Sequence, residues 1–458
     1  MSFCHSVHDF TVRVPAFLHQ HRLMGGAIVL ALTQFGASLA GLFRDNLLAR
    51  TFPGLGVVDV YVASFRPSDL LFQICIMSAL GTVFVPILAA HKAHGRRSEI
   101  DQVLTGTMAM GGAFFGLIAL GLGLGFPWIA GYLVSFTGTD LALYIRFGQM
   151  ALLTNFLFVF GNAFGQYLIT EQRYWMYGIT PILYTLGTIA GTLWLTPFYG
   201  VYGPMMGTVA GAVALVIIRA TAVFHYGFRI PKKIWHPDLH NMGILMLPRM
   251  FALGALQLQL LLFDTIASGL DRGSITINAY ARNFQSVLVG IAGIALAQSA
   301  YSLMSQAAAR GEAKRFKIYV EKGLGIMLLM LIPASILLMA LAPVAARLVH
   351  LQDDTWYPVF RTALILYAIS ASFESASHLL LRGFYAYKDT VTPAIIVVSS
   401  AFLSVGIAWF FTARLAVFSL PLGYSLGQIL QAVILGILLM WKINTKSRMP
   451  ATPSPVLP

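Results

Sequence analysis

The sequence has few charged residues for its length. Of its 458 residues, 10% are Asp, Glu, Lys or Arg and 58% are hydrophobic, whereas a soluble domain typically carries about 25% charged residues. Length alone would suggest soluble domains of about 150 residues each. So little charge cannot cover a water-facing surface of this size, and the composition is therefore that of a membrane protein.

Motifs of catalysis and metal binding are also scarce. The two cysteines, Cys4 and Cys75, exclude a disulfide framework and a CxxC metal pair. The eleven histidines are scattered and form no HExxH motif. The glycines of GLGLGF at 121–126 lie in an apolar stretch, where they are interpreted as helix-packing residues and not as a nucleotide loop. These absences argue against an enzyme.

The net charge of +13 could indicate a nucleic-acid partner, but the sequence has no basic patch of the RNA-binding type. A basic excess in a membrane protein more often reflects cytoplasmic loops beside anionic lipid. We therefore expect membrane lipids, and no nucleic acid, as partners.

Apolar stretches of about 20 residues, the length that a helix needs to cross a bilayer, occur twelve times. Alternation with a period of two residues is absent, which argues against a β-barrel. The sequence predicts an all-α polytopic protein with spans at 24–43, 59–90, 104–133, 143–170, 174–196, 201–226, 241–270, 274–305, 319–346, 360–384, 390–412 and 415–441.

The positions of the basic residues predict the orientation of these spans. With the N-terminus inside, 19 of the 30 Lys and Arg residues fall in cytoplasmic segments and six fall on the opposite side, as the positive-inside rule requires. The predicted organisation is a cytoplasmic N-terminal segment, an N-lobe of six spans, a cytoplasmic linker, a C-lobe of six spans and a disordered cytoplasmic tail, at 1–22, 23–228, 229–240, 241–442 and 443–458.

The two halves share a weak internal repeat at a constant offset of 216 residues. The identical pairs include Arg66/Arg282, Leu80/Leu296 and Gly95/Gly311. Because the offset spans six helices, both halves keep the same orientation, which predicts parallel repeats related by a pseudo-two-fold axis along the membrane normal. Such an arrangement favours a transporter with its substrate between two lobes.

Arg66 and Arg282 lie at equivalent depths inside apolar spans. A cation there costs about 2.5–3.5 kcal/mol at the bilayer centre, unless it snorkels to the headgroups or pairs with an acid such as Asp59. Guanidinium groups bind phosphate through paired hydrogen bonds, so an anionic headgroup is a natural ligand. Two further arginines, Arg146 and Arg219, lie near span ends and are expected at the membrane interface.

The acidic residues inside spans suggest coupling ions. Glu374 and His378 are four residues apart on one helix face, which allows either a satisfied buried pair or a proton-coupling site. Asp264, in QLQLLLFDTIAS, is a candidate cation ligand or else an interhelical hydrogen-bond partner. No further cofactor is expected.

Several motifs resemble the MurJ/MviN lipid II flippases of the multidrug/oligosaccharidyl-lipid/polysaccharide exporter superfamily. The resemblance is carried by GLFRDNLLARTFPG at 41–54, DVYVASFRPSDLL at 59–71, AYARNF at 279–284 and LLRGFYAYKDTVTP at 380–393. It implies transport of an undecaprenyl-diphosphate-linked peptidoglycan precursor to the outer leaflet of the bacterial inner membrane by alternating access, with cell-wall synthesis proteins as partners.

The resemblance also implies site residues. Those that match the family's cationic cavity or its gate are Arg44, Asp45, Asp59, Arg66 and Arg282, and Asp264 matches an acidic sodium ligand of some members. Charged residues usual in the family are replaced by Ser38, Phe72, Met77 and Gln285. Three alternatives therefore stay open: a flippase for another lipid-linked oligosaccharide, a small-molecule exporter of the same superfamily, and a non-transporting membrane scaffold.

Overall fold

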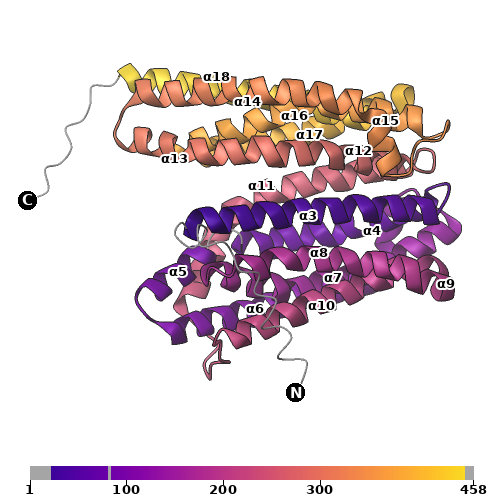
Figure 1. The fold of residues 1–458 in the computed structure, drawn as a ribbon, viewed down its shortest axis with the longest axis horizontal. Helices are drawn as coiled ribbons and strands as arrows, with labels where there is room; N and C mark the ends of the chain where they lie inside the picture. The colour runs from indigo at the N-terminus through magenta and orange to yellow at the C-terminus, as the bar shows by residue number, and fades with distance from the viewer. Residues whose placement is uncertain (1–21, 81–83, 449–458) are drawn as a thin grey trace, which may run out of the picture. The chain divides into compact units, whose positions relative to one another are not determined.

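The computed structural model describes residues 22–80 and 84–448, where helices joined by turns and loops make up the fold and no strand occurs (Figure 1). The predicted N-terminal segment lies almost entirely outside these residues, as do residues 449–458 of the predicted tail. Residues 443–448 of that tail continue the last helix, which ends at Arg448.

Helices cover the predicted spans in order. In the first half these are α3 (Arg22–Thr51), α4 (Gly56–Phe72), α5 (Val85–Ala93), α6 (Arg97–Leu133), α7 (Gly138–Thr170), α8 (Tyr174–Ala190), α9 (Thr196–Tyr199) and α10 (Gly203–His225). In the second half they are α11 (Pro237–Ser268), α12 (Ser274–Leu288), α13 (Ala295–Ala309), α14 (Ala313–Ala340), α15 (Ala342–Leu348), α16 (Tyr357–Ala386), α17 (Val391–Leu415) and α18 (Ser419–Arg448).

Six helical stretches in the described chain are long and apolar enough to cross a membrane, which confirms a membrane protein of the all-α class. They are Arg97–Leu133, Gly138–Thr170, Tyr174–His225, Ala313–Ala340, Tyr357–Ala386 and Val391–Thr445. Two of these stretches, of 52 and 55 residues, each cover two predicted spans. The count of twelve spans stays a prediction.

The offset of 216 residues recurs in the backbone. The π-helical turns Gln73–Met77 and Val289–Ile294 begin 216 residues apart, as do the 3₁₀ turns Gly200–Tyr202 and Ala416–Phe418. Helix ends agree as well, since α4 and α12, α5 and α13, and α7 and α16 all end at this spacing. Local structure therefore repeats between the two halves, while the parallel two-fold axis stays a prediction.

Two compact units make up the fold, each assembled from separate segments. Unit 1 is formed by the described residues of 1–44, 80–112 and 157–240, and unit 2 by those of 45–79, 113–156 and 241–458. The two six-helix lobes predicted at 23–228 and 241–442 stay a prediction.

Glycine contacts join two helices of unit 1. Gly187 of α8 and Gly191, the first residue of the π-helical turn Gly191–Leu195 that follows, pack closely against Gly203–Gly211 of α10. A Cβ atom on Gly207 would lie 2.3 Å from the carbonyl oxygen of Gly187. Small residues four apart allow this approach of two backbones in a membrane helix pair.

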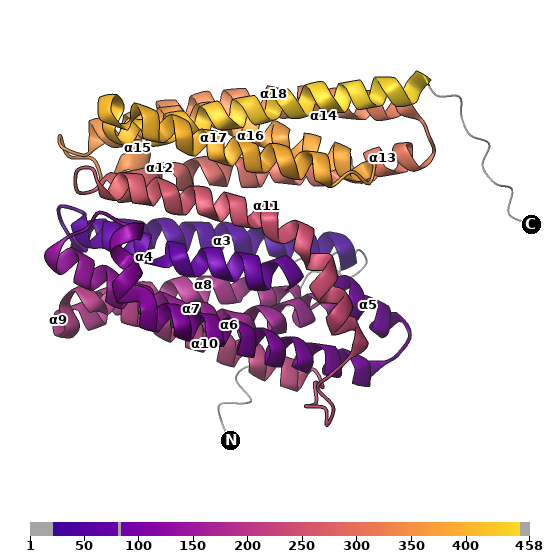
Figure 2. The same cartoon turned by 180° about the vertical axis from the view of Figure 1, so that it is seen from behind.

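Unit 2 contains an apolar core between α14, α16 and α18, which lie side by side in both views (Figures 1 and 2). Its fully buried members include Phe316, Met327, Leu379 and Leu435. This packing fixes α16, the helix that carries Glu374.

Candidate functional site

An ion pair between α4 and α11 lies at the centre of the candidate site in unit 2. Arg66 donates from Nε to Oδ2 of Asp264 at 2.6 Å, and the side chains are 17% and 3% exposed. A buried carboxylate needs such a partner, because an unpaired charge in a low-dielectric environment is costly. The structure thus brings together two residues that the sequence analysis treated separately.

Asp59 of α4 binds the N-terminal end of α12. Its carboxylate accepts hydrogen bonds from the backbone N–H of Gly273 at 2.6 Å and of Thr276 at 2.7 Å, and from the Thr276 hydroxyl at 2.5 Å. Free N–H groups at a helix start favour a carboxylate. Asp59 of α4 therefore anchors α12, the helix of Arg282.

Asp45 makes a second connection to α12. Its backbone carbonyl accepts a hydrogen bond from the Tyr280 hydroxyl at 3.0 Å, and its carboxylate accepts one from Asn283 Nδ2 at 3.2 Å. Asp45 and Asp59 are both buried. Their contacts hold α12 in register, so the two residues support the position of Arg282.

Arg282 lies partly buried against an aromatic ring. Its guanidinium carbon is 5.6 Å from the centre of the Tyr424 ring of α18, a distance that suits a cation–π contact. Among the described residues, no hydrogen-bond partner faces its buried Nε atom. Arg282 also interacts electrostatically with Glu374 and with Asp264.

Glu374 of α16 accepts hydrogen bonds from Gln285 Nε2 at 2.7 Å and from the Tyr424 hydroxyl at 2.8 Å, both to Oε2. His378 lies one turn further along the same helix and interacts electrostatically with Glu374. A role for these two residues in proton coupling stays a prediction.

Both candidate arginines of unit 2 thus interact with one carboxylate, Asp264. Guanidinium groups bind oxyanions bidentately, and Arg282 keeps a donor free for that purpose. Arg44 belongs to unit 1, so its convergence on the other two arginines stays a prediction.

The sodium ion implied by the family resemblance does not fit the observed surroundings of Asp264. The Oδ2 atom of Asp264 accepts the hydrogen bond from Arg66, and the positive guanidinium repels a second cation.

The four departures from the family pattern have different surroundings. Phe72 is buried with its ring 5.9 Å from that of Phe115, and Met77 ends a π-helical turn. The hydroxyl of Ser38 bonds only locally, to the carbonyl oxygen of Gln34 at 3.1 Å. Gln285 alone among these four takes part in the cluster, as the donor to Glu374.

The sequence analysis did not single out three polar residues of unit 2 that bond to or near the candidate site. Tyr424 contacts both Arg282 and Glu374, and Asn155 of α7 donates to Asp69 at 2.8 Å and to Ser68 at 2.7 Å. Tyr367 donates to Asn278 at 2.7 Å. These residues could have been found from the sequence, because hydroxyl and amide groups inside apolar helices need hydrogen-bond partners there.

Known proteins similar to this chain agree with one another. The family model "Lipid II flippase MurJ" matches residues 30–449. A protein of Bdellovibrio bacteriovorus described as a probable lipid II flippase MurJ is 24% identical over 412 residues, which cover 84% of this chain and 76% of that protein. The lipid II flippase MurJ of Burkholderia cenocepacia is 22% identical over 417 residues, covering 87% and 80%.

Solved structures share the fold. Lipid II flippase MurJ in an inward closed conformation matches with a TM-score of 0.75 at 18% identity, covering 92% of this chain and 90% of that one. An inward-facing multidrug resistance MATE transporter of the MOP superfamily matches with a TM-score of 0.77 at 14% identity, covering 91% and 96%. Because the family model matches most of this chain, the chain belongs to the lipid II flippase MurJ family.

Proposed function

We propose that this protein moves an undecaprenyl-diphosphate-linked peptidoglycan precursor from the cytoplasmic to the outer leaflet of the bacterial inner membrane by alternating access. Family membership supports the reaction class. One observation supports placing the lipid-binding site at Arg282: its buried Nε donor has no hydrogen-bond partner in the described chain.

In this proposal Arg66 and Arg282 bind the diphosphate. Asp264 holds Arg66 while no anion is present, and a diphosphate competes with this carboxylate for the guanidinium. Asp45 and Asp59 position α12 and do not contact the substrate. Glu374, hydrogen-bonded to Tyr424, interacts electrostatically with Arg282 and so limits how strongly the anion is held, which favours its release.

Coupling of the cycle to protons, and not to sodium, belongs to the same proposal. Arg66 neutralises Asp264 in place of a sodium ion, and Glu374 with His378 provides the protonatable groups. Both termini are proposed to lie in the cytoplasm, and cell-wall synthesis proteins are the proposed partners.

Binding of the lipid-linked diphosphate by purified single variants tests this site. A charge-assisted hydrogen bond is worth about 1.5–3 kcal/mol, so Arg282→Ala should weaken binding about 10- to 150-fold. Arg66→Lys should retain part of the affinity and Arg66→Ala little, because lysine keeps the charge but loses the paired donors. Asp264→Asn should tighten binding, because it removes the competing charge.

Arg272 provides the matched control. Its side chain is 74% exposed and pairs with Asp140 at 2.9 Å, so Arg272→Ala should bind the lipid as the unmodified protein does. Unchanged binding in both Arg66→Ala and Arg282→Ala would refute the proposed site, and equal losses in all three variants would indicate a nonspecific effect of charge.

A further inference from the structure

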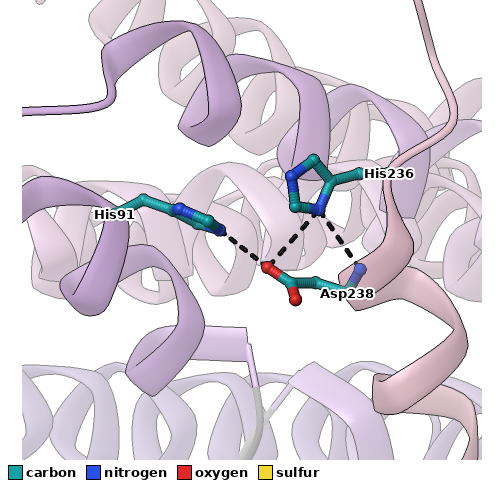
Figure 3. A group of neighbouring side chains, drawn as sticks. All are labelled: His91, His236 and Asp238. Carbon is teal, nitrogen blue, oxygen red and sulfur yellow. Dashed lines mark hydrogen bonds and ion pairs between the residues drawn. The ribbon is translucent and has the colours of Figure 1, made fainter. Parts of the chain in front are cut away.

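A cluster of histidine and carboxylate side chains lies in unit 1 (Figure 3), whereas Arg66, Asp264 and Arg282 belong to unit 2. His91 is near the end of α5, His236 lies just before α11, and Asp238 is in the first turn of α11. One ligand atom from each lies within 4.8 Å of the others. His91 Nε2 is 2.7 Å and His236 Nδ1 is 3.4 Å from Asp238 Oδ2.

The 3.4 Å spacing is close to that between two ligands of a metal ion, whereas 2.7 Å is a hydrogen-bond distance. His236 Nδ1 also accepts a hydrogen bond from the backbone N–H of Asp238 at 3.2 Å, and a bound ion would replace both hydrogen bonds. Zinc binds histidine nitrogen at about 2.0–2.1 Å and carboxylate oxygen at about 2.0–2.2 Å in a tetrahedron, which places ligand atoms a little over 3 Å apart. Two imidazoles and one carboxylate bind zinc with a water molecule as fourth ligand, and the same set also binds iron(II). The side chains of His91, His236 and Asp238 are 11%, 13% and 26% exposed, so an ion can reach them.

A second carboxylate orients His91. Glu99 of α6 lies with Oε2 2.7 Å from His91 Nδ1, so Nδ1 can keep its proton when a metal ion takes the place of the proton between Nε2 and Asp238. Metal-binding histidines almost always donate their other ring nitrogen to such a carboxylate or carbonyl group. With a metal ion on Nε2, Glu99 would accept the remaining ring proton of His91 and so hold the tautomer that a metal ligand needs.

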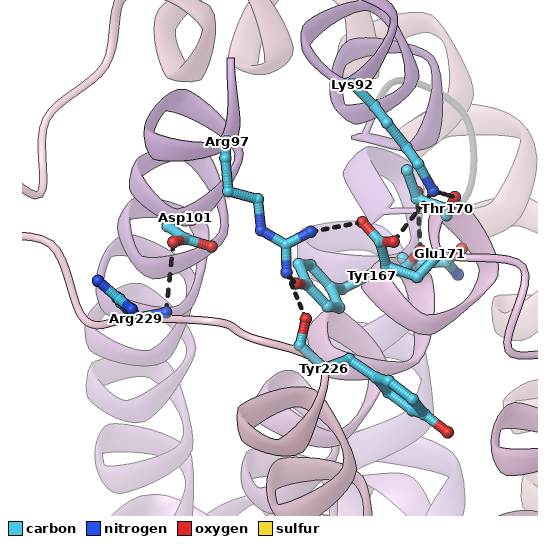
Figure 4. A network of polar contacts seen from close by, with 9 residues as sticks. Lys92, Arg97, Asp101, Tyr167, Thr170, Glu171, Tyr226 and Arg229 are labelled. Atoms are coloured by element: carbon cyan, nitrogen blue, oxygen red, sulfur yellow. Dashed lines mark hydrogen bonds and ion pairs between the residues drawn. The ribbon is translucent and has the colours of Figure 1, made fainter. Parts of the chain in front are cut away.

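Separate contacts hold the segments that carry these residues (Figure 4). Lys92, next to His91, donates to the Thr170 carbonyl at 2.9 Å and to Glu171 at 3.0 Å. In the linker, the backbone N–H of Arg229 donates to Asp101 at 3.2 Å. The ligand-bearing segments are thus positioned without help from a metal.

The internal repeat shows that the turn itself does not require the cluster. The N–H of Arg96 donates to the carbonyl of His91 at 2.9 Å, and the N–H of Glu312 donates to that of Ala307 at 2.9 Å in the equivalent turn. Ala307 and Arg315 stand at the positions that correspond to His91 and Glu99. The second turn has the same backbone without a histidine or an acid at these places, so the side chains in the first serve another purpose.

We propose that His91, His236 and Asp238 bind a divalent transition-metal ion, for which zinc is the best match, with Glu99 as the carboxylate that orients His91. The ion would fasten residues 229–240, the predicted linker between the two halves, to the turn between α5 and α6. The site is independent of the proposed lipid-binding residues.

Zinc titration of the metal-stripped, tag-free full-length protein in detergent tests the proposal. Isothermal titration calorimetry should give one zinc ion per chain, and zinc should raise the unfolding temperature. Cobalt(II) should show the visible absorption of a tetrahedral site. His236→Ala and Asp238→Asn should abolish these signals, and Glu99→Ala should weaken zinc binding by about 10- to 100-fold.

His240→Ala is the matched control, because His240 is exposed and lies only two residues beyond Asp238; it should bind zinc normally. Equal unfolding temperatures without zinc would show that the variants are folded. Zinc binding that persists in both His236→Ala and Asp238→Asn would overturn the proposal. The proposal would also be overturned if the protein bound no zinc and, of the three ligand variants, only His91→Ala lost stability. That result is expected if His91 were only an imidazolium between Glu99 and Asp238.

Discussion

At the scale of single residues, Gln285 sets the electrostatics around Glu374. Its amide donates to Glu374 at 2.7 Å, and a carboxylate in its place would oppose a second negative charge. We expect Gln285→Glu to lower the unfolding temperature at neutral pH by removing a hydrogen bond to a charged group, worth about 1.5–3 kcal/mol. The double variant Gln285→Glu/Glu374→Gln exchanges donor and acceptor and should recover stability; a double variant no better than Gln285→Glu would contradict this account.

Asp389 gives a pH dependence outside the predicted spans. Burial opposes its ionisation, but hydrogen bonds from Lys442 and from the Thr392 backbone outweigh burial and hold the pKa of Asp389 below its usual range. A carboxyl group with a lowered pKa in the folded state stabilises the fold above its unfolded pKa of about 3.9, and the contribution is lost as the pH falls below that value.

Thermal unfolding measured between pH 3 and pH 7 checks this prediction. The unmodified protein should lose more stability below pH 4 than Asp389→Asn does, and the two curves should converge at the acid end. Parallel curves over the whole range would show that Asp389 does not contribute.

The sequence identified most of the charged residues of the candidate site because arginine and aspartate are rare inside apolar spans. It could not pair Arg66 with Asp264, which are 198 positions apart. It did not foresee that Arg219, expected near the membrane interface, is only 3% exposed; its depth in the membrane stays a prediction. This arginine donates to Thr180 at 2.8 Å and to the carbonyls of Gly161 at 2.8 Å and Tyr177 at 3.1 Å, partners that only the packing of three helices brings together.

At the scale of helices, the important glycines are not those that the sequence analysis singled out. Nothing lies within 4 Å of a Cβ atom built on Gly121 or Gly125 of the GLGLGF segment, so the interpretation of those two as packing residues was wrong. The close contacts occur where Gly187 of α8 and Gly191 of the π-helical turn after it face Gly207 of α10. The spacing of these glycines by four residues could have indicated a packing contact. Apolar spans contain many glycines, however, and only the structure shows which of them touch another helix.

Gly207→Ala should therefore destabilise the protein. Its Cβ atom would meet backbone atoms of α8, which cannot rotate away, and overpacking typically costs about 1–3 kcal/mol. Gly121→Ala adds the same methyl group to open space and should be neutral or stabilise by about 0.5–1 kcal/mol through helix propensity. Unfolding temperatures of the two variants decide the matter, and equal values would contradict the packing argument.

At the scale of the whole molecule, the distribution of basic residues predicts the topology. With 19 of 30 Lys and Arg residues assigned to the cytoplasm, reporter fusions after Arg448 and within residues 91–98 should both report a cytoplasmic location. A periplasmic signal at either site would contradict the predicted number of spans.

The helical class and the repeat could be predicted because the length of the apolar stretches and the constant offset can both be read directly from the sequence. The recurrence of turns such as Gly200–Tyr202 and Ala416–Phe418 agrees with that offset. The grouping into two compact units could not be predicted, because segments such as 45–79 and 113–156 join residues 241–458 through contacts between distant parts of the chain.

The most direct test of the proposed function is translocation of lipid II by the purified protein in vesicles, measured as the accessibility of the precursor to an externally added enzyme. The account predicts transfer well above that in protein-free vesicles, a severe loss in Arg282→Ala and unchanged transfer in Arg272→Ala. Transfer by the unmodified protein at the protein-free rate would contradict it, as would full transfer by both Arg66→Ala and Arg282→Ala.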